Sequence, residues 1–148
     1  MTIHQAIQAL DTLQPNPYGN REKLRWLCAL EARIYDECRM QNAECRIGAA
    51  TKKRGHSAFS QLHFDGWELP KKPPVFDGWE TRDLGEPLLL PAAHEEVYLL
   101  WLMCQVDFMN GDWGRYNNSA ARFNTAFAEM ARSLNRRRGD TGVRARNY

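Results

Sequence analysis

The chain has 148 residues, of which 43% are hydrophobic and 26% charged, a composition typical of one globular domain that excludes a largely disordered protein. The formal net charge of +2 is too small to indicate nucleic-acid binding by itself. No apolar run approaches the ~20 residues that a membrane span needs, and the first residues lack a signal-peptide pattern, so we expect no membrane contact and assembly in the cytoplasm.

The first third of the chain is predicted to form two helices. Thr2 can cap a short helix, which ends before the turn-rich run from Pro15 to Gly19. Asn20 can cap a second helix, which we expect to reach about Met40, and a polar loop should follow over 48–60. Apolar residues at helical spacing define the buried faces of these two helices, namely Ile3, Ala6, Ile7, Leu10, Leu24, Leu27, Cys28, Ile34, Tyr35 and Cys38.

The cysteines indicate neither disulfides nor a metal site. Three of the four, Cys28, Cys38 and Cys104, lie in apolar helical patterns, where a reduced thiol behaves as a small hydrophobic side chain. A zinc site drawn from Cys38, Cys45, His56 and His63 would match no common ligand spacing. We therefore expect no metal and no cofactor.

A proline-rich segment separates the two halves of the chain. The sequence Phe-Asp-Gly-Trp-Glu at 64–68 recurs at 76–80, with three prolines between the copies. Prolines remove backbone donors, so residues 61–90 are predicted to be short strands or irregular structure outside the helical core. Trp67 and Trp79 each follow an Asp-Gly turn, where an aromatic side chain either anchors a partner or folds back on the domain's own core.

The last third is predicted to form an antiparallel helix pair. A helix from about Ala92 to Asn110 is apolar almost all round, and a second from about Asp112 to Asn135 carries a long regular stripe. The Asn-Gly link at 110–111 is short enough to make the two helices neighbours. Apolar positions assigned to the faces of this pair include Trp101, Phe108, Trp113, Tyr116, Phe123 and Phe127.

These elements together predict a mainly α, four-helix single domain. The helical domain should cover residues 1–138, including the β or irregular excursion at 61–90. Gly139 and Gly142 should end the last helix, so that residues 139–148 form an extended basic arm. Within the last helix, asparagines are unusual because their side chains compete for the backbone, and they either face solvent or bond to another element or subunit. These asparagines are Asn117, Asn118 and Asn124.

Several segments of the chain resemble one protein family. They are L-L-L-P at 88–91, E-E-V-Y-L-L-W-L at 95–102, D-F-M-N-G at 107–111, R-Y-N-N-S at 115–119 and F-N-T-A-F at 123–127, with Q-P-N-P-Y at 14–18 and K-L-R-W-L at 23–27. They resemble a family of small proteins from the structural gene cassettes of tailed bacteriophages and prophages. The resemblance covers about half to two-thirds of the chain, and the pattern N-G-x-x-x-R-Y-N-N-S is long and unusual.

Members of this family resemble head-to-tail connector adaptors. The resemblance implies a helical subunit of a homo-oligomeric ring, usually of about twelve copies, under the phage portal at the head–tail interface of the virion. It also implies a downstream head-completion or tail protein as a second partner, and no enzymatic activity. The proline-rich segment matches the family's pattern poorly, and the arginine-rich C-terminus extends beyond that pattern.

The arginine-rich C-terminus has three interpretations. The resemblance favours docking on an acidic surface of the portal, a connector channel would also allow non-specific contact with DNA, and a solvated tail would bind nothing. The protein surface that the arginines dock on could belong to the portal or to a neighbouring subunit. The candidate partner-binding residues are therefore Arg136, Arg137, Arg138, Arg144, Arg146, Tyr148, Trp67 and Trp79.

No catalytic pattern is visible in the sequence. The four histidines are scattered, no phosphate-binding loop is present, and the pair Glu95–Glu96 suits the positive end of a helix better than acid–base chemistry. The leading hypothesis is thus a structural connector subunit. The alternative is a DNA-binding or DNA-packaging accessory protein that uses the arginine-rich arm.

Overall fold

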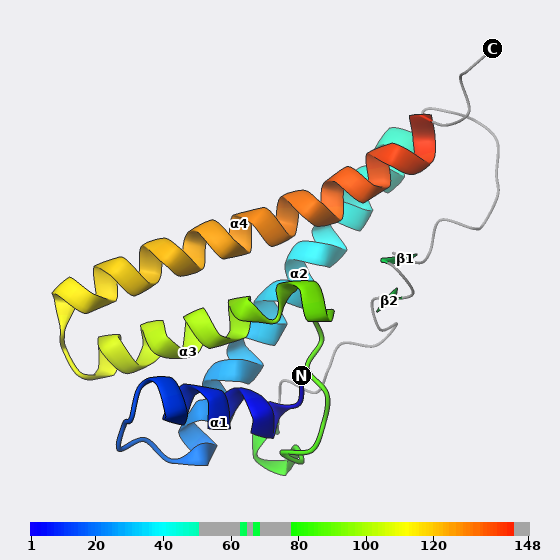
Figure 1. Cartoon of the computed structure of the whole chain (residues 1–148). Helices are drawn as coiled ribbons and strands as arrows, with labels where there is room; N and C mark the ends of the chain where they lie inside the picture. The colour runs from blue at the N-terminus through cyan, green and yellow to red at the C-terminus, as the bar shows by residue number, and fades with distance from the viewer. Residues whose placement is uncertain (51–62, 65–66, 69–77, 144–148) are drawn as a thin grey trace.

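The computed structural model describes residues 1–50, 63–64, 67–68 and 78–143, and it defines side-chain surroundings for residues 1–39 and 78–133. The described part is mainly helical, as predicted (Figure 1). Its elements in chain order are α1 (Ile3–Leu13), α2 (Asn20–Ala50), β1 (His63–Phe64), β2 (Trp67–Glu68), η2 (Trp79–Thr81), η3 (Ala92–His94), α3 (Glu96–Met109) and α4 (Trp113–Val143), where η denotes a 3-10 helix.

Helix α1 begins where the sequence predicts it. Thr2 and Gln5 form a capping box, in which the Gln5 amide donates to Thr2 Oγ1 at 3.3 Å and the Thr2 amide donates to Gln5 Oε1 at 2.9 Å. Lys23 on α2 is buried and pairs with Asp11 on α1 at 2.5 Å. All ten apolar positions predicted for the buried faces of α1 and α2 are buried.

Helix α2 is longer than predicted. It continues to Ala50, so the expected end near Met40 and the expected loop from Gly48 are wrong for these residues. The apolar stripe stops at Cys38, but residues 41–47 contain no proline, and one interior glycine costs only ~1 kcal/mol relative to alanine. The ends of α2 and α4 project in the same direction from the rest of the molecule (Figure 1).

Helices α3 and α4 form the predicted antiparallel pair. Gly111 adopts a φ of 69°, a left-handed conformation that suits glycine and reverses the chain within three residues. The Asp112 carboxylate then accepts the Arg115 amide at 3.1 Å and caps α4. Phe123 and Phe127 are buried between the helices, while the half-buried Trp101 ring lies 5.1 Å from Phe123.

The last helix does not end at Gly139 as predicted. Helix α4 continues through Gly139 and Gly142 to Val143, so residues 139–143 are helical rather than extended. Glycine lowers helix propensity without preventing a helix, and no proline follows to terminate it. The rest of the predicted arm, residues 144–148, lies outside the described residues.

The proline-rich excursion is confirmed in one respect and wrong in another. Strands β1 and β2 form a minimal antiparallel ladder, in which His63 pairs with Glu68 and Phe64 with Trp67. Residues 78–90 do not lie outside the helical core as expected, because the three leucines at 88–90 are buried in it. Backbone bonds from the Ile3 amide to the Glu86 carbonyl at 3.0 Å and from the Leu88 amide to the Met1 carbonyl at 2.9 Å fix this segment beside α1.

Truncation of Phe127 tests the packing of the helix pair. The ring is 9% exposed, and the Arg33 guanidinium lies 4.6 Å from its centroid. Phe127→Ala should lower the free energy of unfolding by about 3–5 kcal/mol, because it removes a buried ring and leaves a cavity. Urea denaturation followed by circular dichroism measures this loss. Phe108→Ala, at a ring that is 45% exposed, is the control and should cost much less, whereas equal losses would contradict the packing.

Candidate functional site

The loop between α1 and α2 meets the α3–α4 turn at one end of the molecule (Figure 1). Gln14 donates from its amide nitrogen to Asp107 Oδ1 at 2.8 Å, and the Tyr18 hydroxyl donates to Asn110 Oδ1 at 2.7 Å. More than ninety residues separate the partners of each bond in the sequence. We call this region the turn end and define it as residues 13–19 and 107–119.

Asp107 is the centre of the turn end. Its side chain is 3% exposed, yet both oxygens have partners, because Ser119 Oγ donates to Oδ2 and Gln14 donates to Oδ1. The Arg115 guanidinium lies 3.7 Å from Oδ1 and is largely exposed, so the buried charge is balanced from the surface. A buried carboxylate with several donors is costly to disrupt, and it therefore holds α3, α4 and the α1–α2 loop in one arrangement.

Three aromatic rings lie on the surface of the turn end. The ring of Phe108 is 5.8 Å from Trp113 and 5.5 Å from Tyr116, and the last two are 6.1 Å apart. Trp113 is 60% exposed and Phe108 45% exposed. We call these three residues the aromatic patch. The other large hydrophobic side chains exposed in the described part of the chain, Leu13 and Met109, belong to the same end.

This exposure could not be predicted from the apolar stripes alone. Phe108 and Trp113 fall on the stripes assigned to the helix pair, and the first of these helices was interpreted either as central in the domain or as facing a neighbouring subunit. At this end α3 and α4 have no neighbour over those positions in the described structure, so the stripes reach the surface. The same periodicity therefore marks both the core and a surface patch.

The three asparagines singled out from the sequence do not link elements within the subunit. Asn117, Asn118 and Asn124 are exposed on α4, and no hydrogen bond joins their side chains to another described element. The prediction of inter-element bonding is wrong within one subunit, since these positions face solvent. Asn110 performs that role instead by accepting the Tyr18 hydroxyl. Asn110 and Tyr18 lie in segments that carry the family resemblance, and that resemblance was the only feature of the sequence that pointed to them.

A second buried carboxylate holds the segment that leads into α3. Glu31 on α2 is 1% exposed, and it accepts the Arg82 guanidinium at 2.5 Å and the Leu89 amide at 2.8 Å. The Tyr98 hydroxyl lies 3.5 Å from the same carboxylate and accepts the Leu90 amide at 2.9 Å. Burial raises the pKa of Tyr98 well above its ordinary value, and the Glu31 charge raises it further. These bonds hold residues 82–90 against α2 and α3.

The remaining predicted partner-binding residues have different outcomes. Trp79 is half-buried and packs against the core, which favours the interpretation that it belongs to the domain itself. Trp67 lies in β2, but its side-chain surroundings are not among the described ones. Residues 136–138 lie in α4, likewise without described side chains. Arg144, Arg146 and Tyr148 lie outside the described residues.

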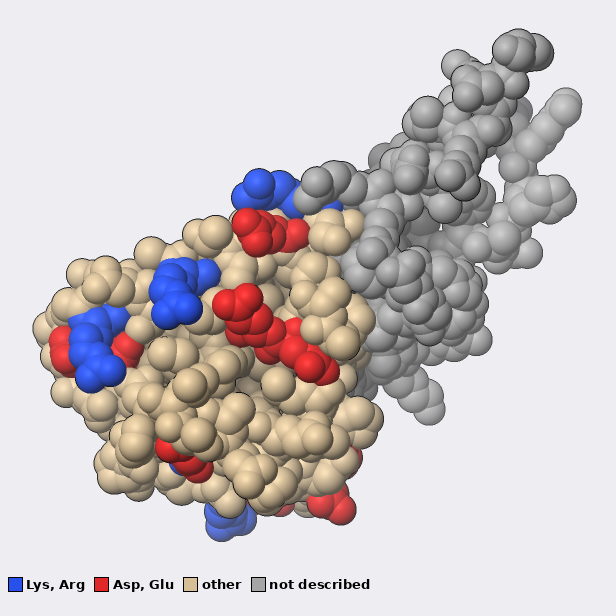
Figure 2. Space-filling view, viewed as in Figure 1, with Lys and Arg blue, Asp and Glu red and all other residues tan. Residues whose placement is uncertain are grey.

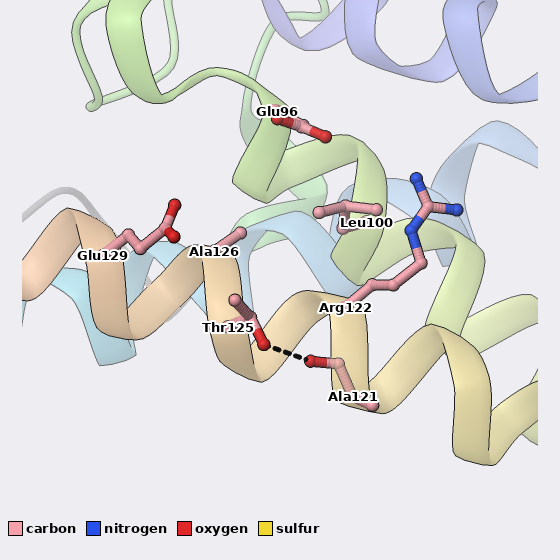
Figure 3. A pocket seen from close by; sticks show the side chains of 7 residues that line it. All are labelled: Glu96, Leu100, Ala121, Arg122, Thr125, Ala126 and Glu129. Atoms are coloured by element: carbon pink, nitrogen blue, oxygen red, sulfur yellow. Dashed lines mark hydrogen bonds between the residues drawn. The ribbon is translucent and has the colours of Figure 1, made fainter.

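A shallow groove of about 350 Å³ runs between α3 and α4 (Figure 3). Glu96 and Leu100 border it on α3, and on α4 Glu129 and Arg122 lie at opposite ends of the row of lining side chains. Small side chains form its floor. The lining consists of Glu96, Leu100, Ala121, Arg122, Thr125, Ala126 and Glu129. It holds no histidine, cysteine or serine, and its one hydroxyl, on Thr125, donates to the Ala121 carbonyl at 3.0 Å (Figure 3).

Charge is distributed unevenly along the chain. The residues with described side chains, 1–39 and 78–133, hold nine lysines and arginines against thirteen aspartates and glutamates, a net charge of −4. Residues 134–148 hold five arginines and one aspartate, a net charge of +4. On the face shown in Figure 2, acidic side chains gather near the middle of the described surface, with basic ones around them.

No protein-family model, no curated protein and no solved structure matches this chain. The resemblance to tailed-phage connector proteins therefore rests on the sequence segments alone. Among the described side chains, no group of three or more histidines, cysteines, aspartates or glutamates is placed to hold a metal ion. None of the described helices is long and apolar enough to cross a membrane.

Replacement of Asp107 tests its role in the turn end. Asp107→Asn should lower the free energy of unfolding by about 1–3 kcal/mol, because an amide keeps the shape but loses the charge-assisted bonds from Gln14 and Ser119. Thermal or urea unfolding measures the loss. Asp36→Asn, on the exposed face of α2, is the matched control and should change stability very little. A neutral effect of Asp107→Asn would show that the carboxylate does not hold this end together.

The raised pKa of Tyr98 predicts a dependence of stability on alkaline pH. The folded state keeps the Tyr98 proton to a higher pH than the unfolded state does, so this contribution is complete below the unfolded pKa near 10 and is lost as pH rises above it. Urea unfolding at pH 8 to 11 should show falling stability in the wild type. Tyr98→Phe should be less stable at pH 8 but decline less steeply, and parallel declines would contradict the assignment.

Proposed function

We propose that this chain is a structural subunit of a tailed bacteriophage, a head-to-tail connector adaptor. It forms a homo-oligomeric ring under the portal, links the portal to a downstream head-completion or tail protein, and resides at the head–tail interface of the virion after assembly in the host bacterial cytoplasm. The observation that carries this proposal is the aromatic patch, exposed at a firmly held end of a helical subunit.

The aromatic patch has the properties of a protein-binding surface. Tryptophan and tyrosine are enriched among residues that dominate binding energy, and a ring ordered before binding loses little entropy on contact. The three rings contact one another, and the Asp107 bonds fix the two helices that present them. A structural role rather than a catalytic one fits this surface.

The segments that carry the family resemblance supply the residues that form the turn end. The segments Q-P-N-P-Y, D-F-M-N-G and R-Y-N-N-S supply Gln14, Tyr18, Asp107, Asn110 and Ser119, which form the bonds of the turn end. Residues that contribute one polar network are expected to recur together in a family that needs this geometry. The resemblance and the site thus concern the same residues.

The aromatic patch suits a different protein better than a second copy of this chain. All large hydrophobic side chains that are exposed in the described residues belong to the turn end, so a second copy offers them no other apolar surface. Two copies would then meet patch to patch about a twofold axis, which closes as a dimer and builds no ring. We assign the patch to the portal or to the downstream protein.

The alternative function is that of a DNA-binding or DNA-packaging accessory protein. The observation in its favour is the charge of +4 on residues 134–148, since arginines neutralise phosphates without regard to sequence. The charge of −4 over residues 1–39 and 78–133 opposes DNA contact in those regions, whereas residues 40–77 carry a net charge of +2. The C-terminal segment is therefore the most basic candidate for DNA contact, which is compatible with a connector that surrounds a DNA channel.

Binding to portal tests the proposed function. The full chain should bind the purified portal protein of the same phage or prophage, and electron microscopy of the mixture should show rings on the portal. Replacing both Phe108 and Trp113 by serine should weaken this binding at least about tenfold, a loss of ~1.4 kcal/mol, because the variant removes the apolar anchor of the interface. Sedimentation velocity measures the complex, and circular dichroism verifies that the variant is folded.

A control and a contrary outcome complete this test. Ala29→Ser, at an exposed position on α2, should leave portal binding unchanged. A chain that ignores portal but shifts on duplex DNA, with a strong dependence on salt, would replace the connector by the DNA-binding alternative.

A further inference from the structure

The groove between α3 and α4 has two acidic side chains available for a basic ligand. Glu96 and Glu129 are both exposed, and neither is in an ion pair with another described residue. Arg122 is at the opposite end of the α4 row from Glu129, and Glu96 projects from α3 between them, so the groove holds two carboxylates against one guanidinium (Figure 3). Alanines and a threonine between them leave space for an incoming side chain.

The C-terminal segment of the same chain has the complementary charge but does not reach this groove. Helix α4 continues fourteen residues beyond Glu129 to Val143, which is ~21 Å at 1.5 Å per residue. Arg146 follows Val143 by three residues, which span at most ~11 Å when fully extended. Arg144 is closer still to the helix end, so neither arginine returns to Glu129 while α4 is intact.

The arginines inside α4 do not reach the groove either. Arg136, the nearest of the three at 136–138, follows Glu129 by seven residues, or about 10 Å along the helix axis. Side chains on one helix pair at spacings of three or four residues. Figure 1 also shows the C-terminal part of α4 directed away from the helices that surround α3. The basic segment is therefore presented outward.

We propose that the basic C-terminal segment of one copy, residues 136–146, binds the α3–α4 groove of a second copy and pairs with Glu96 and Glu129. This inference rests on the proposed function and specifies the contact between neighbours in the ring. The two surfaces are different, so the contact is head-to-tail, and a repeated head-to-tail contact closes into a ring when its rotation allows. A twofold contact would lack this property.

The chemistry of the contact predicts its behaviour. Exposed ion pairs contribute little individually, so several arginines must act together, and ring closure adds one more contact without adding another copy. Added salt screens exposed charges and should weaken the association. Isolated copies should therefore associate weakly and reversibly, and most strongly at low ionic strength.

Charge-reversal variants of the full chain test the proposal by sedimentation velocity over a range of concentrations and salt. The groove variant carries Glu96→Lys and Glu129→Lys, and the arm variant carries Arg136→Glu, Arg137→Glu and Arg138→Glu. Each alone should weaken self-association at least about tenfold at low salt, and an equimolar mixture of the two should associate again. A control for the groove variant carries the same change in charge at exposed positions elsewhere, Glu22→Lys and Glu80→Lys, and should associate like the wild type.

Clear results would overturn the proposal. A groove variant that associates like the wild type, a mixture that fails to associate, or a wild type that stays monomeric at low salt and high concentration each does so. Circular dichroism confirms folding, and Glu129→Lys alone serves if the double variant unfolds. Portal binding through the aromatic patch is measured separately, so a wild type that binds portal without self-association would remove this inference and leave the proposed function.

Discussion

One buried carboxylate, Asp107, fixes the positions of the α1–α2 loop and α4 relative to α3. It lies at the C-terminal end of α3, where an unbalanced negative charge is unfavourable both for the helix dipole and for burial. Donors from the α1–α2 loop and from α4 offset these costs, and Arg115 supplies positive charge from the surface. Because these partners come from separate elements, satisfying the carboxylate also fixes their relative positions.

Glu31 applies the same constraint at the other end of α3. The segment between η2 and α3 has little regular structure, so its backbone amides need acceptors that no neighbouring strand provides. Glu31 accepts one amide directly, and Tyr98 accepts the next beside it. Arg82 neutralises the charge, and the leucines of the segment can then be buried. The two carboxylates together hold the irregular parts of the chain against a helical core.

Helical periodicity was sufficient to predict much of the fold. The apolar spacing predicted the buried faces of α1, α2 and the α3–α4 pair, because a residue's place on a helix follows from its position alone. The same spacing does not tell whether another element covers a face, which is why it did not predict that Phe108 and Trp113 are exposed in the subunit. The C-terminal ends of α2 and α4 were predicted too early, because both helices continue through glycines and no proline stops them.

The polar contacts of the turn end had no such signal. The bonds of Gln14 with Asp107 and of Tyr18 with Asn110 join residues more than ninety positions apart, and polar pairs at that separation leave no periodic pattern. Only the unusual composition of the segments that carry the family resemblance pointed to these residues. A long-range hydrogen bond depends on tertiary placement, and this placement follows from the packing of α1, α2 and α4 around α3.

The small net charge of the chain results from regions of opposite charge. A net charge of +2 gives no reason to expect association. Residues 1–39 and 78–133 are negative and the C-terminal segment is positive, so these two regions attract each other between copies. Within one copy, the length of α4 keeps the two regions apart. The aromatic patch lies at the α3–α4 turn, and the basic segment lies at the opposite end of α4 (Figure 1). One partner can therefore bind the aromatic rings while neighbouring copies bind through charge, because the two contacts use different residues and compete for none.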